Sequence, residues 1–181
     1  MESSLFISGK LLSITTFVYL LAMFFYIIYA PLTNLYESLV FFAWCGAGIY
    51  LVFEFYYKNR FMGAFVMPFI SIAMAYASFS PDISQEIQPL VPALQSNWLI
   101  YHVIKCFFAY AAFALACGVS IMYILKSRNE EKKQGLGDIL SFFPSTATLD
   151  DINYKSIAIG FPMLTLGIIT GAAWANYAWG S

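Results

Sequence analysis

The side chains that could do chemistry are few, and they lie in two stretches of an apolar chain of 181 residues. His102 is the only histidine, and Lys105 follows it after about one helical turn. Trp174 and Trp179 supply two of the four tryptophans, in a segment that runs to Ser181. An imidazole can ligate a metal, sense protons or hydrogen-bond to a neighbouring helix. Paired indoles can form a platform for a planar ligand or anchor a helix at the lipid headgroups.

Two charged side chains, Lys105 and Glu37, also fall within apolar stretches. An ammonium group among lipid chains is costly unless it reaches the membrane surface or meets an opposite charge. Glu37 is the expected counter-charge, because it lies at the outer end of another apolar stretch. Lys105 therefore has two interpretations: it extends to the surface, or it meets an anionic ligand group such as a carboxylate.

Composition identifies a lipid bilayer as the setting of these residues. Hydrophobic residues make up 61% of the chain and charged residues 10%, with a mean hydropathy of +0.72, whereas soluble domains carry about 25% charged residues. The net charge of −1 gives no sign of nucleic-acid binding. P-loop, GxGxxG, HExxH, GxSxG and CxxCH motifs are absent from the sequence, so nucleotide chemistry and serine or zinc hydrolysis have no support.

Five stretches are long and apolar enough to cross a bilayer, which takes about 20 residues. They predict an all-α, polytopic helix bundle that forms a single membrane domain over residues 1–181, with spans at about 11–30, 35–57, 61–79, 98–125 and 154–177. The first stretch is interpreted as a retained span, because no basic leader or cleavage site precedes it. The charged segment 126–151 is predicted to be a loop.

Basic residues set the predicted orientation, because Lys and Arg gather in cytoplasmic loops. The connections 31–34 and 80–97 contain neither residue type, and every Lys and Arg except Lys105 belongs to the N-terminal segment and the alternate connections (Lys10, Lys58, Arg60, Lys126, Arg128, Lys132, Lys133 and Lys155). We therefore expect a cytoplasmic N-terminus and an extracytoplasmic C-terminus. His102 and the tryptophan-rich segment then share the extracytoplasmic side.

Small residues predict close contact between the last two spans. Gly167 and Gly171 stand four residues apart, and small residues recur along the preceding span (Ala109, Ala112, Ala116 and Ser120). Such residues let membrane helices approach closely. The lack of bulk after Gly171, just before Trp174, would leave space for the indole or for a group lying against it. The cysteines are interpreted as small buried apolar residues (Cys45, Cys106 and Cys117).

Three segments, taken together, resemble the cytochrome c assembly family. They are 31–44, with Asn-Leu-Tyr-Glu-Ser; 88–103, with Trp-Leu-Ile-Tyr-His; and 174–181, which reads Trp-Ala-Asn-Tyr-Ala-Trp-Gly-Ser. Within that family the chain is most similar to System II cytochrome c synthase membrane subunits of the CcsA/ResC type. The resemblance is specific because three ordered segments carry it and it covers nearly the whole chain.

The resemblance implies a haem-handling function on the extracytoplasmic face. It implies that His102 is an axial ligand of the haem iron, and such a ligand orients the macrocycle and influences its redox behaviour. The surface that holds haem b would come from the tryptophan-rich segment (Trp174, Asn176, Trp179 and Gly180). Lys105 and Glu37 become candidate polar partners, Lys105 for a haem propionate.

The resemblance also implies partners and a location. Haem would be presented to the CxxCH motif of apocytochrome c, whose thiols form thioethers with the haem vinyl groups. A membrane partner of the ResB/CcsB type is expected, in the bacterial cytoplasmic membrane. Family members carry a longer tryptophan-rich segment and a second extracytoplasmic histidine, so we expect a partial sequence, shortened at both ends, that does not act alone as a haem lyase.

Two alternative functions stay open from the sequence. A membrane regulator of haem synthesis from the same family would keep the helices without attaching haem. A transporter or channel subunit would use His102, Lys105 and Glu37 as a polar pathway. That alternative calls for polar residues through the full membrane depth, whereas these three cluster near the outer face.

Overall fold

The chain forms a bundle of long helices in the computed structural model, which describes residues 34–83, 95–132 and 140–180 together with Val18, Leu21, Ala22 and Pro92. The helices are α2 (Leu35–Tyr57), the 3₁₀ turn η1 (Arg60–Met62), α3 (Gly63–Phe79), α4 (Asn97–Lys132) and α6 (Thr146–Trp179). Four described segments are long and apolar enough to cross a membrane: Leu35–Tyr57, Arg60–Phe79, Asn97–Glu130 and Thr146–Trp179. The predicted all-α membrane bundle is confirmed. The predicted span 11–30 lies almost wholly outside the described residues.

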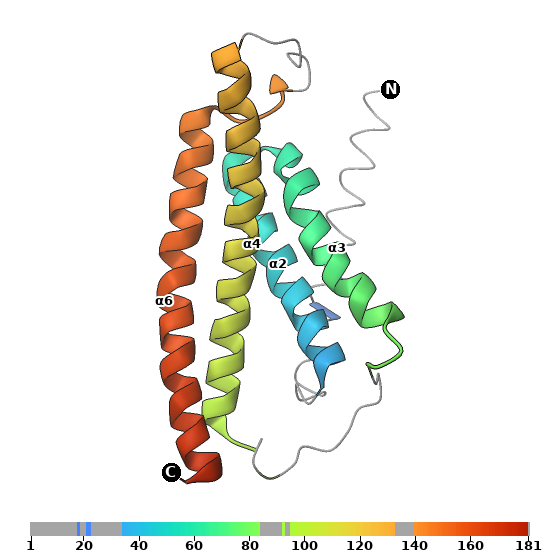
Figure 1. Ribbon diagram of the computed structural model, residues 1–181, viewed down its shortest axis with the longest axis vertical. Coiled ribbons are helices and arrows are strands. Elements are labelled where there is room, and N and C mark those ends of the chain that lie inside the picture. The colour runs from blue at the N-terminus through green and yellow to red at the C-terminus, as the bar shows by residue number, and fades with distance from the viewer. Residues whose placement is uncertain are drawn as a thin grey trace.

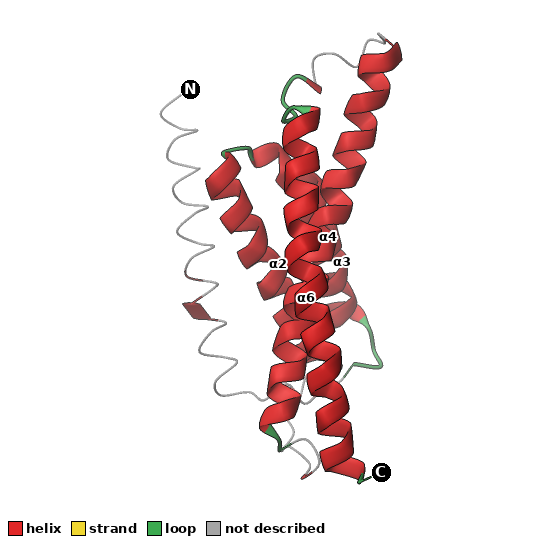
Figure 2. Ribbon diagram, turned by 90° about the vertical axis from the view of Figure 1, so that its left-hand side faces the viewer, coloured by secondary structure: helices red, strands yellow, loops and turns green. Residues whose placement is uncertain are grey.

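Helix α4 is the centre of this bundle. It makes the most extensive helix contact with α6, and it also packs against α2 and α3. Figure 1 shows α6 running beside α4 in the opposite direction, with α2 and α3 beyond α4. Figure 2 looks onto α6 and shows it crossing α4 near the middle of the bundle. The start of α4 and the end of α6 therefore lie at the same end.

The predicted loop over 126–151 is wrong at both ends. Helix α4 continues to Lys132, and α6 already begins at Thr146. Ser145 caps α6, because its hydroxyl oxygen accepts a hydrogen bond from the backbone N–H of Thr148 at 3.1 Å. Apolarity marks only the part of each helix that would lie in lipid, while caps and local hydrogen bonds set where the helix ends.

The segment before α6 is fastened to α4 and to the turn after α2. Lys126 donates hydrogen bonds to the backbone carbonyls of Phe143 and Pro144, at 3.1 and 2.7 Å. The rings of Phe61 and Phe142 stack with centroids 5.4 Å apart and planes 6° from parallel. These contacts join α4, η1 and the start of α6 at the end that carries most of the basic residues.

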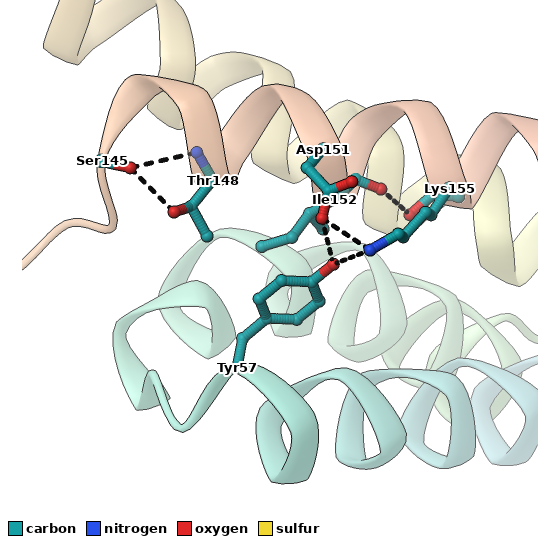
Figure 3. A network of polar contacts seen from close by, with 7 residues as sticks. Tyr57, Ser145, Thr148, Asp151, Ile152 and Lys155 are labelled. Carbon is teal, nitrogen blue, oxygen red and sulfur yellow. Dashed lines mark hydrogen bonds and ion pairs between the residues drawn. The ribbon is translucent and has the colours of Figure 1, made fainter.

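A polar network ties α2 to α6 at the same end (Figure 3). Tyr57 donates its hydroxyl proton to Asp151 Oδ2, at 2.7 Å. Lys155 Nζ donates to that carboxylate oxygen at 2.7 Å and to the Tyr57 hydroxyl oxygen at 3.0 Å. Asp151 and Lys155 are one turn apart on one face of α6. Each of these three side chains thus forms a hydrogen bond with the other two.

Small residues allow α4 to lie close to its neighbours. A Cβ added at Gly118 would lie 2.9 Å from the carbonyl oxygen of Phe65 on α3, and one added at Gly167 would lie 2.7 Å from the sulfur of Cys106. Three of the predicted small positions on α4 are buried (Ala109, Ala112 and Ala116). The predicted close contact between the last two spans is therefore confirmed.

Removing the Tyr57 hydroxyl isolates the contribution of the network. We expect Tyr57→Phe to lower the free energy of unfolding in detergent by about 1 kcal/mol, the value of one net hydrogen bond. Tyr56→Phe is the matched control, because Tyr56 is 71% exposed and its ring, 5.7 Å from Lys155 Nζ, is kept. Equal losses for the two variants would contradict this role of the network.

Candidate functional site

The candidate site residues lie at the end of the bundle opposite the Tyr57 network. His102 is in the first turns of α4 (Asn97–Lys132), and Trp174 and Trp179 are in the last turns of α6 (Thr146–Trp179). Because the two helices are antiparallel, their opposite sequence ends meet here (Figure 1). The contact surface between α4 and α6 at this end is called the α4–α6 seam below.

His102 makes a hydrogen bond across the α4–α6 seam. Its Nδ1 lies 2.8 Å from the backbone carbonyl oxygen of Gly167. A carbonyl oxygen only accepts, so this contact assigns the imidazole proton to Nδ1. In the neutral ring, Nε2 then carries the lone pair, and Nε2 has no hydrogen bond to any residue in the described part of the chain. A neutral imidazole in this tautomer is ready to ligate a metal through Nε2.

The imidazole fits into the seam because residue 171 has no side chain. A Cβ on Gly171 would lie 2.6 Å from His102 Nδ1 and 2.9 Å from Cε1. On the α4 side, the sulfur of Cys106 is 3.5 Å from Nδ1. The space that the sequence predicted beside Gly171 is therefore filled by the His102 ring rather than by an indole.

The Gly167 carbonyl has a second side-chain donor, Thr170. The Thr170 hydroxyl oxygen lies 3.0 Å from the carbonyl oxygen of Gly167 and 2.8 Å from that of Leu166. Thr170 is 8% exposed, so its hydroxyl depends on these protein acceptors. The Thr170 hydroxyl thus has its acceptors within α6, and the Gly167 carbonyl accepts from both Thr170 and His102.

The two tryptophans form an edge-to-face pair at the end of α6. Their ring centroids are 4.9 Å apart and their planes are inclined by 66°, so the indoles do not make one flat surface. Trp179 is 69% exposed, and Trp174 is partly buried. Trp174 follows Gly171 by three residues, a spacing that places both on one side of a helix. Trp174 is therefore on the side of α6 that meets His102.

Asn176 and Gly180 have a structural role at the end of α6. The backbone N–H of Gly180 donates to the carbonyl of Asn176 at 2.9 Å. Gly180 has a φ of 57°, a left-handed conformation that glycine adopts without steric cost. Both residues are exposed, so the predicted part that they play in holding a ligand stays a prediction.

Lys105 contacts an aromatic ring instead of the counter-charge that the sequence predicted. Its Nζ lies 5.3 Å from the centroid of the Tyr101 ring, a distance typical of a cation–π interaction. Glu37 is 1% exposed in the first turn of α2, where its backbone N–H donates to Asn34 Oδ1 at 2.8 Å. The ion pairs shown among the described residues lie toward the other end of the bundle (Arg60 with Glu54, Lys155 with Asp151).

The structure joins residues that the sequence treated separately. Gly167 and Gly171 were predicted to pack helices, and they also receive the His102 ring. Cys106 is buried as predicted and borders the imidazole, whereas Cys117 is exposed, on a helix surface where lipid would lie. The sequence signal for this contact was a histidine in one apolar stretch and two glycines four residues apart in the next. It did not specify which of these residues would face one another.

The comparison with known families identifies the family of this chain. Residues 32–181, which include the four long helices of the described residues, match the family described as "Cytochrome C assembly protein". The chain belongs to the cytochrome c assembly family. The resemblance inferred from its three sequence segments is confirmed.

Individual members of the cytochrome c assembly family show the same relationship. The chain is 40% identical over 171 residues to "Cytochrome c biogenesis protein CcsA" of Mesostigma viride, covering 83% of this chain and 56% of that protein. Proteins of the same name from Chlorella vulgaris and Chlamydomonas reinhardtii are each 39% identical, over 83% of this chain and over 57% and 42% of their own lengths. The chain thus spans about half the length of these relatives. No solved structure matches it.

Proposed function

We propose that this chain is a haem-handling component of cytochrome c biogenesis that holds haem b, its substrate, at the extracytoplasmic end of the α4–α6 seam. The family assignment supports the process. The observation that carries the site is the 2.8 Å hydrogen bond from His102 Nδ1 to the Gly167 carbonyl. This bond leaves Nε2 as the ligating atom, as second-shell acceptors do for metal-bound histidines.

The residues of the seam suit a haem ligand. Gly167 and Gly171 confine the imidazole to one orientation, so little side-chain freedom remains to be lost when iron binds. Trp174 and Trp179 offer aromatic surface near the same end of α6 for a macrocycle to lie against. In this proposal Asn176 and Gly180 border that surface.

Two charged residues are the proposed polar partners of the substrate. Lys105 follows His102 by about one turn of α4, and its ammonium group can meet a haem propionate while the Tyr101 ring supports it. Glu37 is a buried carboxyl group at the outer end of α2. We propose it as a second polar partner, separate from Lys105.

These positions give each residue a role in the proposed attachment of haem. Haem supplies the two vinyl groups, and each thioether forms when a cysteine S–H of the apocytochrome c CxxCH motif adds across a vinyl C=C, so that no group leaves. His102 holds the iron on one face, and the tryptophans restrict the tilt of the ring. The 181 residues contain a single histidine, so a histidine on the opposite face would come from outside them.

The membrane setting and the partners complete the proposal. The helices fit a protein that crosses a membrane several times. The named relatives are from algae, so the bacterial cytoplasmic membrane stays a prediction. Because this chain spans about half of those relatives, haem lyase activity and a ResB/CcsB-type partner are proposed for the assembled system rather than for this chain alone.

Replacing His102 tests the ligand assignment. We expect His102→Ala to lower the haem-to-protein ratio of the purified protein, read from the Soret band, by roughly tenfold or more, because the iron loses its bond to the imidazole. Ile104→Ala is the control, since Ile104 is 36% exposed on the same helix and has no polar atom.

The same experiment separates ligation from helix packing. A His102→Ala protein that keeps its haem but unfolds at a lower temperature would show that the imidazole only joins α4 to α6. That outcome would overturn the proposed site. Loss of haem with a folded bundle, judged by circular dichroism, would support it.

The proposed orientation can be tested by cysteine labelling. In a variant without the native cysteines, Asp82→Cys should react with a membrane-impermeant maleimide in intact cells. Glu130→Cys should react only after the membrane is permeabilised. Both positions are exposed acidic residues, and they lie at opposite ends of the bundle. The reverse pattern would place His102 on the cytoplasmic side and contradict the proposal.

A further inference from the structure

Gly171 occupies a position in α6 where the backbone does not require glycine. Among the described glycines only Gly180 has a positive φ, and Gly171 lies within a continuous helix. Glycine in a helix interior costs about 1 kcal/mol relative to alanine. Glycine therefore suits position 171 because it has no side chain, and not because of its backbone freedom.

That space belongs to the His102 imidazole. A Cβ built on Gly171 would lie 2.6 Å from Nδ1, 2.9 Å from Cε1 and 3.2 Å from Cγ, so one edge of the ring rests on the α6 backbone. Gly48 on α2 is the opposite case, because a Cβ there meets nothing within 4 Å. The same substitution at these two glycines thus has different consequences.

The ring has little room to retreat. The Cys106 sulfur lies 3.5 Å from Nδ1 on the α4 side, and it is itself close to α6, since a Cβ on Gly167 would lie 2.7 Å from it. A methyl group at position 171 would have to push the imidazole away from the Gly167 carbonyl. The 2.8 Å hydrogen bond at Nδ1 would then lengthen or break.

We propose that Gly171 is a positioning residue for His102: without a side chain there, Nδ1–H reaches the Gly167 carbonyl, and this decides which ring nitrogen is free to bind a ligand. When that hydrogen bond is lost, the imidazole carries its proton on Nε2 in a fraction of the molecules. That proton must be displaced before a metal binds to Nε2. The consequence for haem rests on the proposed function. The effect on the imidazole tautomer does not.

The tautomer can be read directly in the haem-free chain. Because His102 is the only histidine in the 181 residues, ¹⁵N-histidine labelling gives a single imidazole spectrum, provided that the purification tag contains no histidine. We expect the wild-type chain and Gly48→Ala to show protonated Nδ1 and unprotonated Nε2. Gly171→Ala should show a substantial fraction with the proton on Nε2. An unchanged Nδ1–H spectrum in Gly171→Ala would overturn the proposal.

A double-mutant cycle keeps the test decisive if Gly171→Ala folds poorly. The cycle compares Gly171→Ala with and without His102→Ala, and it isolates the interaction between the two positions. We expect the alanine at 171 to lower the unfolding temperature when His102 is present, and to leave it unchanged or raise it when His102 is absent, because alanine is the better helix former. Equal destabilisation in the two backgrounds would show that the methyl group strains something other than the imidazole.

Haem binding separates this proposal from the proposed function. If His102→Ala removes haem, we expect Gly171→Ala to weaken haem affinity by roughly tenfold, the size of effect seen when a metal-ligating histidine loses its hydrogen-bond acceptor. Gly48→Ala should bind like the wild type. If His102→Ala keeps its haem, the proposed function fails, and the tautomer spectra still decide the role of Gly171.

Discussion

The end of the bundle that carries His102 depends on the contact between its imidazole and the α6 backbone at Gly167 and Gly171. A polar side chain within a membrane helix needs a partner, because lipid provides none. Helix carbonyls are within reach of a neighbouring helix only where the backbones come close, and glycines on α6 provide that approach. One contact therefore joins α4 to α6 and gives Nδ1 of the imidazole its acceptor.

The two ends of the bundle differ in how their polar side chains are hydrogen-bonded. At the basic end, Tyr57, Asp151 and Lys155 satisfy one another and tie α2 to α6. At the other end, the His102 ring has a hydrogen-bond partner for only one of its nitrogens within the described residues, and the exposed Trp179 ends α6 at the same end of the bundle. Because α4 and α6 are long, continuous helices with extensive contact, the imidazole lies between two packed helices, as the proposed site requires.

Much of the fold could be predicted from where apolar stretches occur. The predicted span 35–57 coincides with α2, and His102, Trp174 and Trp179 were all placed near one end. The loop predicted over 126–151 was wrong because a polar helix end depends on caps such as Ser145 rather than on apolarity. The position of a residue along a helix also does not specify which neighbouring helix or side chain it faces. That is why Lys105 was expected to meet Glu37 but lies over Tyr101, and why the Gly167 carbonyl was not foreseen as the acceptor for His102.

The proposed site requires that His102 offers Nε2, and not Nδ1, to iron. Hyperfine spectroscopy of the ferric, haem-loaded protein tests it most directly, with histidine labelled with ¹⁵N at one ring nitrogen at a time. The proposed site predicts strong coupling from a directly bonded nitrogen when Nε2 carries the label, and only weak coupling when Nδ1 carries it. Strong coupling from labelled Nδ1, or none from either nitrogen, would contradict it.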